Sequence, residues 1–239
     1  MTEGQFFFAF DGSAHMEFTE FVLAASTATL GEEPAARTHA DILEYRLDLA
    51  SDGVDALAAY DGVLPLLVTN RTEREGGEAA DGPARLGVLE TAIKQPSVAA
   101  VDVELAAIRD GGAERVVDHA RERDVAVVVS THDFERTPDR ERMRALLRAG
   151  ADHGDVAKLA VTAQNRGDVL DLLAVTDELS PTAPVATMAM GEPGRHSRVV
   201  APLYGSCLGY APVDPADATA PGQYGLERFR HLVDRLRGR

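Results

Sequence analysis

Tryptophan is absent from this 239-residue sequence, cysteine occurs once, and aromatic residues make up only 5% of the chain. The single cysteine, Cys207, excludes an intrachain disulfide and a cysteine cluster for zinc or iron–sulfur, which fits a reducing cytoplasm. No apolar run is long enough to span a bilayer, and the run 6–10 is too short for a signal peptide and lacks a basic flank. We therefore expect a cytoplasmic protein.

Basic residues are also scarce, since 24 Lys and Arg stand against 39 Asp and Glu, for a formal net charge of −15. Such a surface repels nucleic-acid backbones and anionic lipid, so we expect neither nucleic acid nor membrane as a partner. Arginine replaces lysine almost throughout and alanines are many. This composition is typical of adaptation to high salt, where screening weakens self-repulsion.

One of the two lysines lies where an ammonium group is unexpected. Lys158 falls within the apolar, β-branched run 155–162, which predicts a short buried strand, whereas Lys94 does not. Loss of water disfavours the charged form of a lysine, and a neutral amine is a nucleophile toward carbonyls. A snorkelling or ion-paired lysine at a strand end is the alternative interpretation.

The first fifteen residues differ from the rest of the chain. They fit a hairpin around an Asp11–Gly12 turn, or a non-native leader that ends before Met16. We favour the leader, and assign residues 16–239 to one catalytic domain.

From Met16 onward, short apolar runs alternate eight times with alanine-rich amphipathic segments. The expected strands are 21–26, 41–48, 64–71, 99–105, 125–132, 156–162, 184–190 and 206–211, and the clearest helices are 113–123, 139–149, 166–179 and 226–237. Strict alternation predicts a parallel sheet in the α/β class, and eight units predict a single (β/α)8 TIM barrel. An open doubly wound sheet is the main alternative, but segment 26–31 lacks its glycine-rich phosphate turn.

Charged residues lie on the predicted strands with a spacing of two, which places them on one face. Glu44, Arg46 and Asp48 share a face of the second strand, as either a ligand site or a structural ion-pair network. Asp102 and Glu104 are spaced likewise on the fourth strand, and we interpret them as floor residues that orient their neighbours.

Further polar residues stand at the carboxyl ends of later strands, where barrels carry their chemistry. His132 ends the fifth strand, next to the strand of Lys158, and is suited to move protons in imine chemistry near neutral pH. Arg198 begins the seventh helix, where it could bind a carboxylate with help from the helix N-terminus. Met188 lies on the predicted inner face as a soft apolar wall, and segment 217–223 is suited to a lid.

Together these segments resemble the type I 3-dehydroquinate dehydratases, the Schiff-base dehydratases of the shikimate pathway. The resemblance covers about residues 21–237. It rests on six pieces in order: 44–48 (EYRLD), Arg71 with 75–78 (EGGE), 130–134 (STHDF), 158–160 (KLA), 188–190 (MAM) through Arg198, and 220–223 (APGQ).

The resemblance implies a role for each residue that matches a family motif. Lys158 would form an imine with the C3 ketone of 3-dehydroquinate, His132 would transfer protons, and Glu75 would orient His132. The remaining matched residues are implied to bind the substrate: Ser26, Glu44, Arg46, Arg71, Met188, Arg198, Tyr210, Thr219 and Gln223. No metal or dissociable cofactor is implied.

Two positions depart from the family pattern. Thr219 stands where a serine is usual, and Tyr210 stands where an aromatic residue, often phenylalanine, is expected. A class I aldolase-type barrel and a non-catalytic hydroxy-acid-binding barrel remain the functional alternatives. An apolar patch on the outer helices would allow a homodimer, and the residues do not distinguish aromatic synthesis from quinate breakdown.

Overall fold

The computed structural model describes residues 16–217, 220 and 222–239 of the chain. Residues 1–15, interpreted above as a leader or hairpin, and Thr219 lie outside the described residues.

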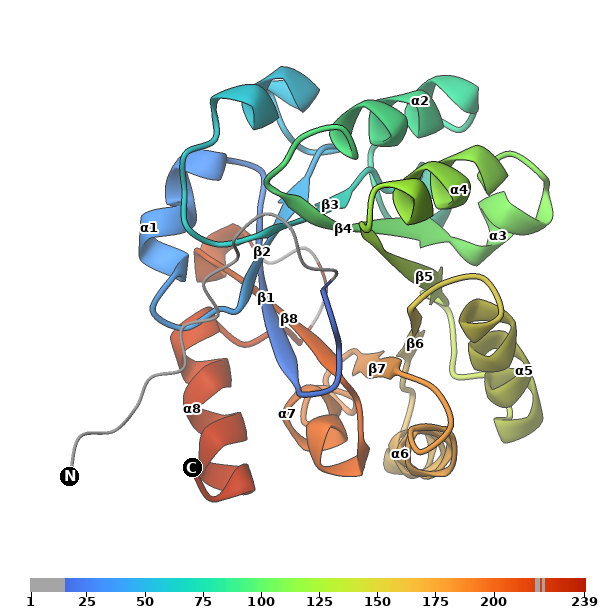
Figure 1. Ribbon diagram of the computed structural model, residues 1–239. Coiled ribbons are helices and arrows are strands. Elements are labelled where there is room, and N and C mark those ends of the chain that lie inside the picture. Colours follow the sequence, from blue (N-terminus) through green and yellow to red (C-terminus); the bar gives the residue numbers. More distant parts are fainter. Residues whose placement is uncertain (1–15, 218–219, 221) are drawn as a thin grey trace.

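Eight parallel strands form the centre of the molecule (Figure 1). They are β1 (Val22–Thr27), β2 (Ile42–Arg46), β3 (Leu66–Thr69), β4 (Val98–Glu104), β5 (Ala126–His132), β6 (Val156–Thr162), β7 (Val185–Met190) and β8 (Leu208–Pro212). Consecutive strands pair from β1 to β7, and β8 pairs with β1. This order is a (β/α)8 barrel and excludes the doubly wound sheet. Each predicted strand is confirmed, with ends that differ by at most two residues.

The barrel closes between β7 and β8 without a regular ladder. An isolated bridge joins Val185 to Ser206, and the Cys207 N–H donates to the Val185 carbonyl at 2.8 Å. The Ser206 hydroxyl also accepts the Thr187 N–H at 3.0 Å. We call this junction the seam.

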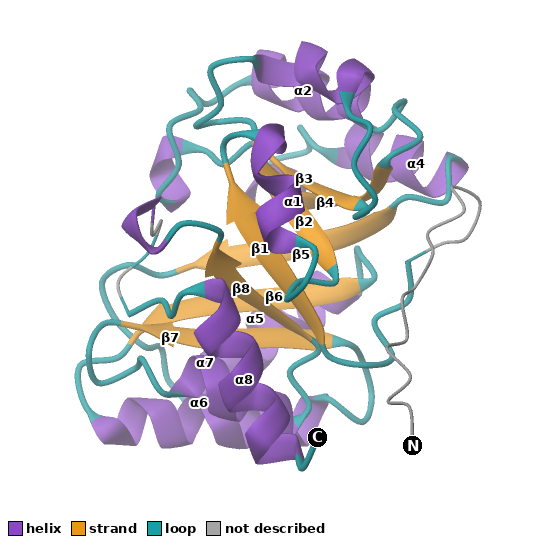
Figure 2. Ribbon diagram, turned by 90° about the vertical axis from the view of Figure 1, so that its left-hand side faces the viewer, coloured by secondary structure: helices purple, strands orange, loops and turns teal. Residues whose placement is uncertain are grey.

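Helices surround the strands on the outside, as Figures 1 and 2 show. They are α1 (Glu33–Ala36), α2 (Pro83–Ala92), α3 (Leu105–Arg109), α4 (Glu114–Glu122), α5 (Arg140–Ala151), α6 (Arg166–Leu179), α7 (Ser197–Val200) and α8 (Leu226–Arg237). No helix in the described ranges has the length and hydrophobicity needed to cross a membrane.

The expectation of a full amphipathic helix after every strand is wrong in three units. α1 and α7 have four residues each, and the β2–β3 connection holds only a 3₁₀ helix, Gly53–Ala59. Two of the long helices, α5 and α6, begin at a side-chain cap. Asp139 caps α5 by accepting the Arg142 N–H at 2.8 Å, and Asn165 and Asp168 form a reciprocal capping box on α6.

Strand alternation divides the core into two layers. Residues such as Leu43, Val103 and Leu159 face outward and pack beneath the helices. Ile42, Ala100 and Val156 face inward and fill the lower part of the barrel with apolar side chains. The inward residues further along the same strands are polar, so the barrel has an apolar floor and a charged mouth.

Candidate active site

A cavity opens at the carboxyl ends of the strands, and its lining includes eleven of the twelve site residues predicted from sequence. They are Ser26, Glu44, Arg46, Arg71, Glu75, His132, Lys158, Met188, Arg198, Tyr210 and Gln223. The twelfth, Thr219, lies outside the described residues. The structure therefore brings these side chains together, whereas their individual roles stay predictions.

Lys158 lies in the middle of β6, and its side chain enters the barrel with 6% of its surface exposed. Its Nζ lies 3.0 Å from Asp102 Oδ2 and 4.1 Å from the centre of the Tyr210 ring. The amine is thus buried as predicted. It is also ion-paired, as the alternative interpretation held, although Lys158 lies within β6 and not at a strand end.

Asp102 is the residue that sequence reasoning undervalued. Its side chain is fully buried, and its Oδ1 accepts from Ser130 Oγ at 2.6 Å and from Arg71 Nη2 at 2.8 Å. Burial would raise the pKa of this carboxyl, but Arg71 and Lys158 outweigh burial and hold the pKa well below its usual range. Asp102 is therefore a fixed anion at the floor of the cavity. Its two-residue spacing from Glu104 was the available signal.

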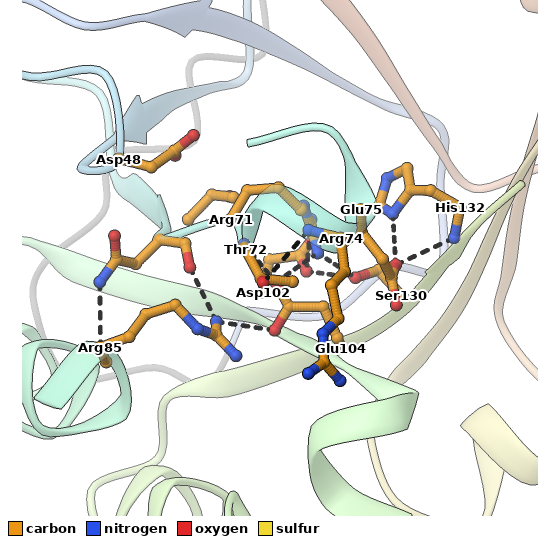
Figure 3. A network of polar contacts seen from close by, with 12 residues as sticks. Asp48, Arg71, Thr72, Arg74, Glu75, Arg85, Asp102, Glu104, Ser130 and His132 are labelled. Carbon is orange, nitrogen blue, oxygen red and sulfur yellow. Dashed lines mark hydrogen bonds and ion pairs between the residues drawn. The ribbon is translucent and has the colours of Figure 1, made fainter. Parts of the chain in front are cut away.

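Arg71 lies at the centre of a buried polar network (Figure 3). Besides Asp102, Arg71 Nη1 reaches Ser130 Oγ at 2.7 Å and Glu104 Oε1 at 3.1 Å, and Glu104 Oε2 accepts from Arg85 at 2.8 Å. Burial works against the guanidinium charge, yet Asp102 and Glu104 raise the Arg71 pKa. Buried charges are tolerated when they are paired, and here Arg71 and Arg85 share the charges of Asp102 and Glu104.

His132 and Glu75 form a second pair at the rim of the cavity (Figure 3). His132 Nδ1 lies 2.8 Å from Glu75 Oε2, and the His132 backbone N–H donates to the same oxygen at 3.0 Å. Burial and the nearby cations Arg71 and Lys158 hold the His132 pKa well below its usual range. Burial raises the Glu75 pKa to about 7, with Arg71 opposing that rise and Glu104 adding to it. His132 is accordingly a neutral base at neutral pH.

Two glycines explain how the loop after β3 presents Glu75. Gly76 has φ +78°, a left-handed conformation that favours glycine, and it ends the short helix Glu73–Glu75. A Cβ at Gly77 would collide with the Arg71 carbonyl oxygen, and the Ala79 N–H donates to this oxygen at 3.0 Å. The loop can fold back on Arg71 only because both side chains are missing.

The β1–β3 side of the cavity holds a carboxylate and a guanidinium with separate partners. Glu44 accepts hydrogen bonds from Ser26 Oγ at 2.5 Å and Thr69 Oγ1 at 2.8 Å. Arg46 makes a bidentate pair with Asp48 at 2.9 and 2.6 Å. The ion-pair interpretation of these charges is correct for Arg46 and Asp48, while Glu44 and Arg46 also line the cavity.

The opposite wall comes from β7, α7 and β8. Met188 and Arg198 are both buried, and burial lowers the Arg198 pKa to about 10, which leaves the guanidinium charged at neutral pH. Because α7 has only four residues, the expected help from a helix N-terminus is small. Tyr210 is buried too, and its hydroxyl has no hydrogen-bond partner among the described residues. Gln223 lies at the mouth, where its Oε1 accepts the Ala220 N–H at 3.1 Å.

The family model for type I 3-dehydroquinase matches residues 23–238. The chain belongs to the type I 3-dehydroquinase family. The 3-dehydroquinate dehydratase of the archaeon Haloarcula marismortui is 57% identical over 225 residues, which is 92% of this chain and 98% of the relative. The similarity to a protein from a halophilic archaeon agrees with the acidic composition.

Solved structures of the family share the fold. The 3-dehydroquinate dehydratase of Geobacillus kaustophilus has a TM-score of 0.82 and 30% identity, over 92% of each chain. The type I enzyme of Clostridium difficile, solved with covalent modified comenic acid, has a TM-score of 0.82 and 26% identity, over 94% of this chain and 95% of the other. Membership in this family gives no support to the aldolase or to the non-catalytic barrel.

Proposed function

We propose that this type I 3-dehydroquinase family member dehydrates 3-dehydroquinate to 3-dehydroshikimate through an imine on Lys158. The observation that carries the proposal is the buried Lys158 amine, which faces the same cavity as His132 on the neighbouring strand. Relatives named 3-dehydroquinate dehydratase support the substrate, and the covalent modified comenic acid in the Clostridium difficile structure supports covalent chemistry.

Imine formation begins with removal of a proton from the Lys158 ammonium. Neutral His132 is the nearby base, because Asp102, with its depressed pKa, keeps its negative charge. Addition of Nζ to the C3 ketone forms a C–N bond, and the carbonyl π electrons move to oxygen, which takes up a proton. The nitrogen gives up one of its two protons, and the oxygen takes up this second proton and leaves as water, which yields a protonated imine.

The protonated imine then draws electrons from the neighbouring C2–H bond. His132 takes the C2 proton, a C2–C3 double bond forms, and the C=N π electrons move to nitrogen. Their return expels the C1 hydroxyl, which leaves as water with the proton from His132. Hydrolysis of the conjugated imine releases the enone product and frees Lys158.

The remaining cavity residues hold the substrate. Arg198, charged and buried, is suited to bind the carboxylate with its planar guanidinium. Glu44, Arg46 and Arg71 supply polar groups for the ring hydroxyls, and Gln223 covers the mouth. Glu75 orients His132 through the contact to Nδ1, which leaves Nε2 as the nitrogen that meets the substrate.

Borohydride reduction in the presence of 3-dehydroquinate tests this proposal, with peptide mass spectrometry as the readout. We expect a stable adduct on Lys158 and none on the exposed Lys94, which is an internal control. Lys158→Arg keeps a cation beside Asp102 but removes the amine, so it should abolish the adduct and turnover. Lys94→Arg should preserve both. An adduct on Lys94, or none at all, overturns the proposal.

A further inference from the structure

We infer that Asp102 is the counter-ion of the imine and that its carboxylate keeps the imine nitrogen protonated during the reaction. This inference rests on the proposed function, because it concerns an intermediate on Lys158. Asp102 acts by charge, while the transferred protons are carried by His132.

The geometry holds the Asp102 carboxylate in one orientation. Its Oδ1 accepts from Ser130 Oγ at 2.6 Å and from Arg71 Nη2 at 2.8 Å, whereas its Oδ2 accepts from Lys158 Nζ at 3.0 Å. The side chain is fully buried, so bulk water does not screen the charge. Asp102 therefore cannot turn away without breaking several charge-assisted contacts.

Other groups face the Lys158 amine from several elements. The basic side chains that line the cavity with Lys158 come from four elements, and the acidic ones are Glu44 and Glu75. The basic ones are Arg46 on β2, Arg71 after β3, His132 on β5 and Arg198 on α7. The Tyr210 ring on β8 covers the amine at 4.1 Å. Arg71 shares its charge between Asp102 and Glu104, and Arg46 is paired with Asp48. Among the described residues, Asp102 is the only carboxylate within ion-pair distance of Nζ.

The contact between Asp102 and the Lys158 nitrogen matters because only a protonated imine can react further. A protonated imine carries one N–H and a positive charge, so it can replace the ammonium as the donor to Oδ2. A neutral imine cannot draw electrons from the C2–H bond, and elimination stops there. Positive charge near the nitrogen, such as that of Arg71, favours the neutral imine, and the negative charge of Asp102 opposes this effect.

Two hydride reagents measure the protonation state of the imine directly. Cyanoborohydride reduces protonated imines, whereas borohydride reduces both forms, so the ratio of the two adducts on Lys158 reports the protonated fraction. With 3-dehydroshikimate or 3-dehydroquinate as the probe, the wild-type ratio should stay high through neutral pH. In Asp102→Asn, the pH midpoint at which the ratio falls should drop by roughly one to three pH units.

Two further variants make the test specific. Glu104→Gln removes a buried carboxylate from the same network without touching Lys158, and should move the midpoint much less. Ser130→Ala keeps the Asp102 charge but removes a hydroxyl that orients it, and should move the midpoint slightly in the same direction. Circular dichroism verifies that each variant is folded. If Asp102→Asn does not fold, the midpoint of Ser130→Ala tests the inference.

The outcomes separate this inference from the proposed function. If neither reagent labels Lys158 in the wild-type protein, the proposed function fails, and the inference fails with it. If both reagents label the wild type but the midpoint is unchanged in Asp102→Asn and Ser130→Ala, the inference alone is overturned. An equal shift of the pH midpoint in Glu104→Gln also overturns the inference. The shift would then reflect the net charge of the buried network and not the contact between Asp102 and Lys158.

Discussion

His132 Nδ1 lies 2.8 Å from Glu75 Oε2, and the His132 backbone N–H donates to the same oxygen at 3.0 Å. One carboxylate thus fixes both the ring and the main chain of this residue. Strand β5 ends at His132, so the backbone contact also anchors the end of the strand. In the proposed function, this pair holds the base that serves the buried Lys158 amine.

Replacement of His132 by alanine should lower turnover about a hundred- to ten-thousand-fold, because the proton transfers lose their positioned base. The assay is the ultraviolet absorbance of the conjugated enone formed from 3-dehydroquinate. His231→Ala, on the exposed side of α8, is the matched control and should keep wild-type turnover. Near-normal turnover of His132→Ala would contradict the assignment.

The stability of the Glu75→Gln variant should depend on pH in a defined direction. Burial raises the Glu75 pKa from its ordinary value of 4.5 to about 7, so its stabilising contribution is complete below about pH 4.5 and is lost as pH rises through 7. Glutamine does not titrate. The variant should therefore gain stability over the wild type between pH 5 and pH 8, on the order of 1–3 kcal/mol.

Thermal unfolding at both pH values measures this effect. Glu141→Gln, at an exposed position of α5, is the matched control for the same substitution outside the cavity. If the melting temperatures of Glu75→Gln and the wild type differ by the same amount at pH 5 and pH 8, burial of the ionised carboxylate costs no stability.

The Tyr210→Phe variant separates the roles of the ring and the hydroxyl. The ring would remain over Lys158, while a buried hydroxyl that lacks a partner among the described residues would be removed. An unsatisfied buried polar group costs about 1–3 kcal/mol, so the free protein should be equally stable or more stable. Burial, Asp102 and Glu44 raise the Tyr210 pKa well above its usual range, which keeps the hydroxyl a donor for a ligand oxygen.

We therefore expect Tyr210→Phe to bind 3-dehydroshikimate more weakly and to show a higher KM. Calorimetric titration with 3-dehydroshikimate measures the affinity, and differential scanning calorimetry measures the stability of the free protein. A clear loss of stability in the free protein would mean that the hydroxyl supports the fold instead. Unchanged affinity would exclude a contact with the ligand.

Salt should raise the melting temperature of this protein. The net charge is −15, so the acidic side chains repel one another. Salt shortens the Debye length and reduces this repulsion. Exposed ion pairs such as Arg140–Asp171 weaken in salt, but pairs of this kind contribute little. Melting curves from low to molar KCl give the measurement, and a melting temperature that does not rise would refute the halophilic interpretation.

Strands were predictable from the sequence because each is a run of buried apolar residues with clear ends. β6, predicted as 156–162, was found at Val156–Thr162. Helix lengths were less predictable, since nothing in the sequence around α1 and α7 shows that each helix ends after four residues. Alternation showed which residues face inward, and the resemblance to a family identified the lining of the cavity.

Pairing between distant strands was not predictable in the same way. Asp102 and Lys158 are 56 positions apart, and their contact depends on barrel closure and on the reach of a lysine side chain. Spacing along one strand identifies a face but not the partner across the barrel. For this reason Asp102 was interpreted as a floor residue and its contact with the amine was missed.

At the seam, two neighbouring strands of the barrel lack a regular ladder of hydrogen bonds. One isolated bridge joins β7 to Ser206, just before β8. Lys158 on β6 and Tyr210 on β8 meet from opposite sides of the seam, with Nζ 4.1 Å from the ring centre. The contact between the Lys158 amine and the Tyr210 ring therefore spans the seam from inside the barrel. Separation of β7 from β8 would move the Tyr210 ring away from Lys158, so the surroundings of this buried amine depend on closure of the barrel.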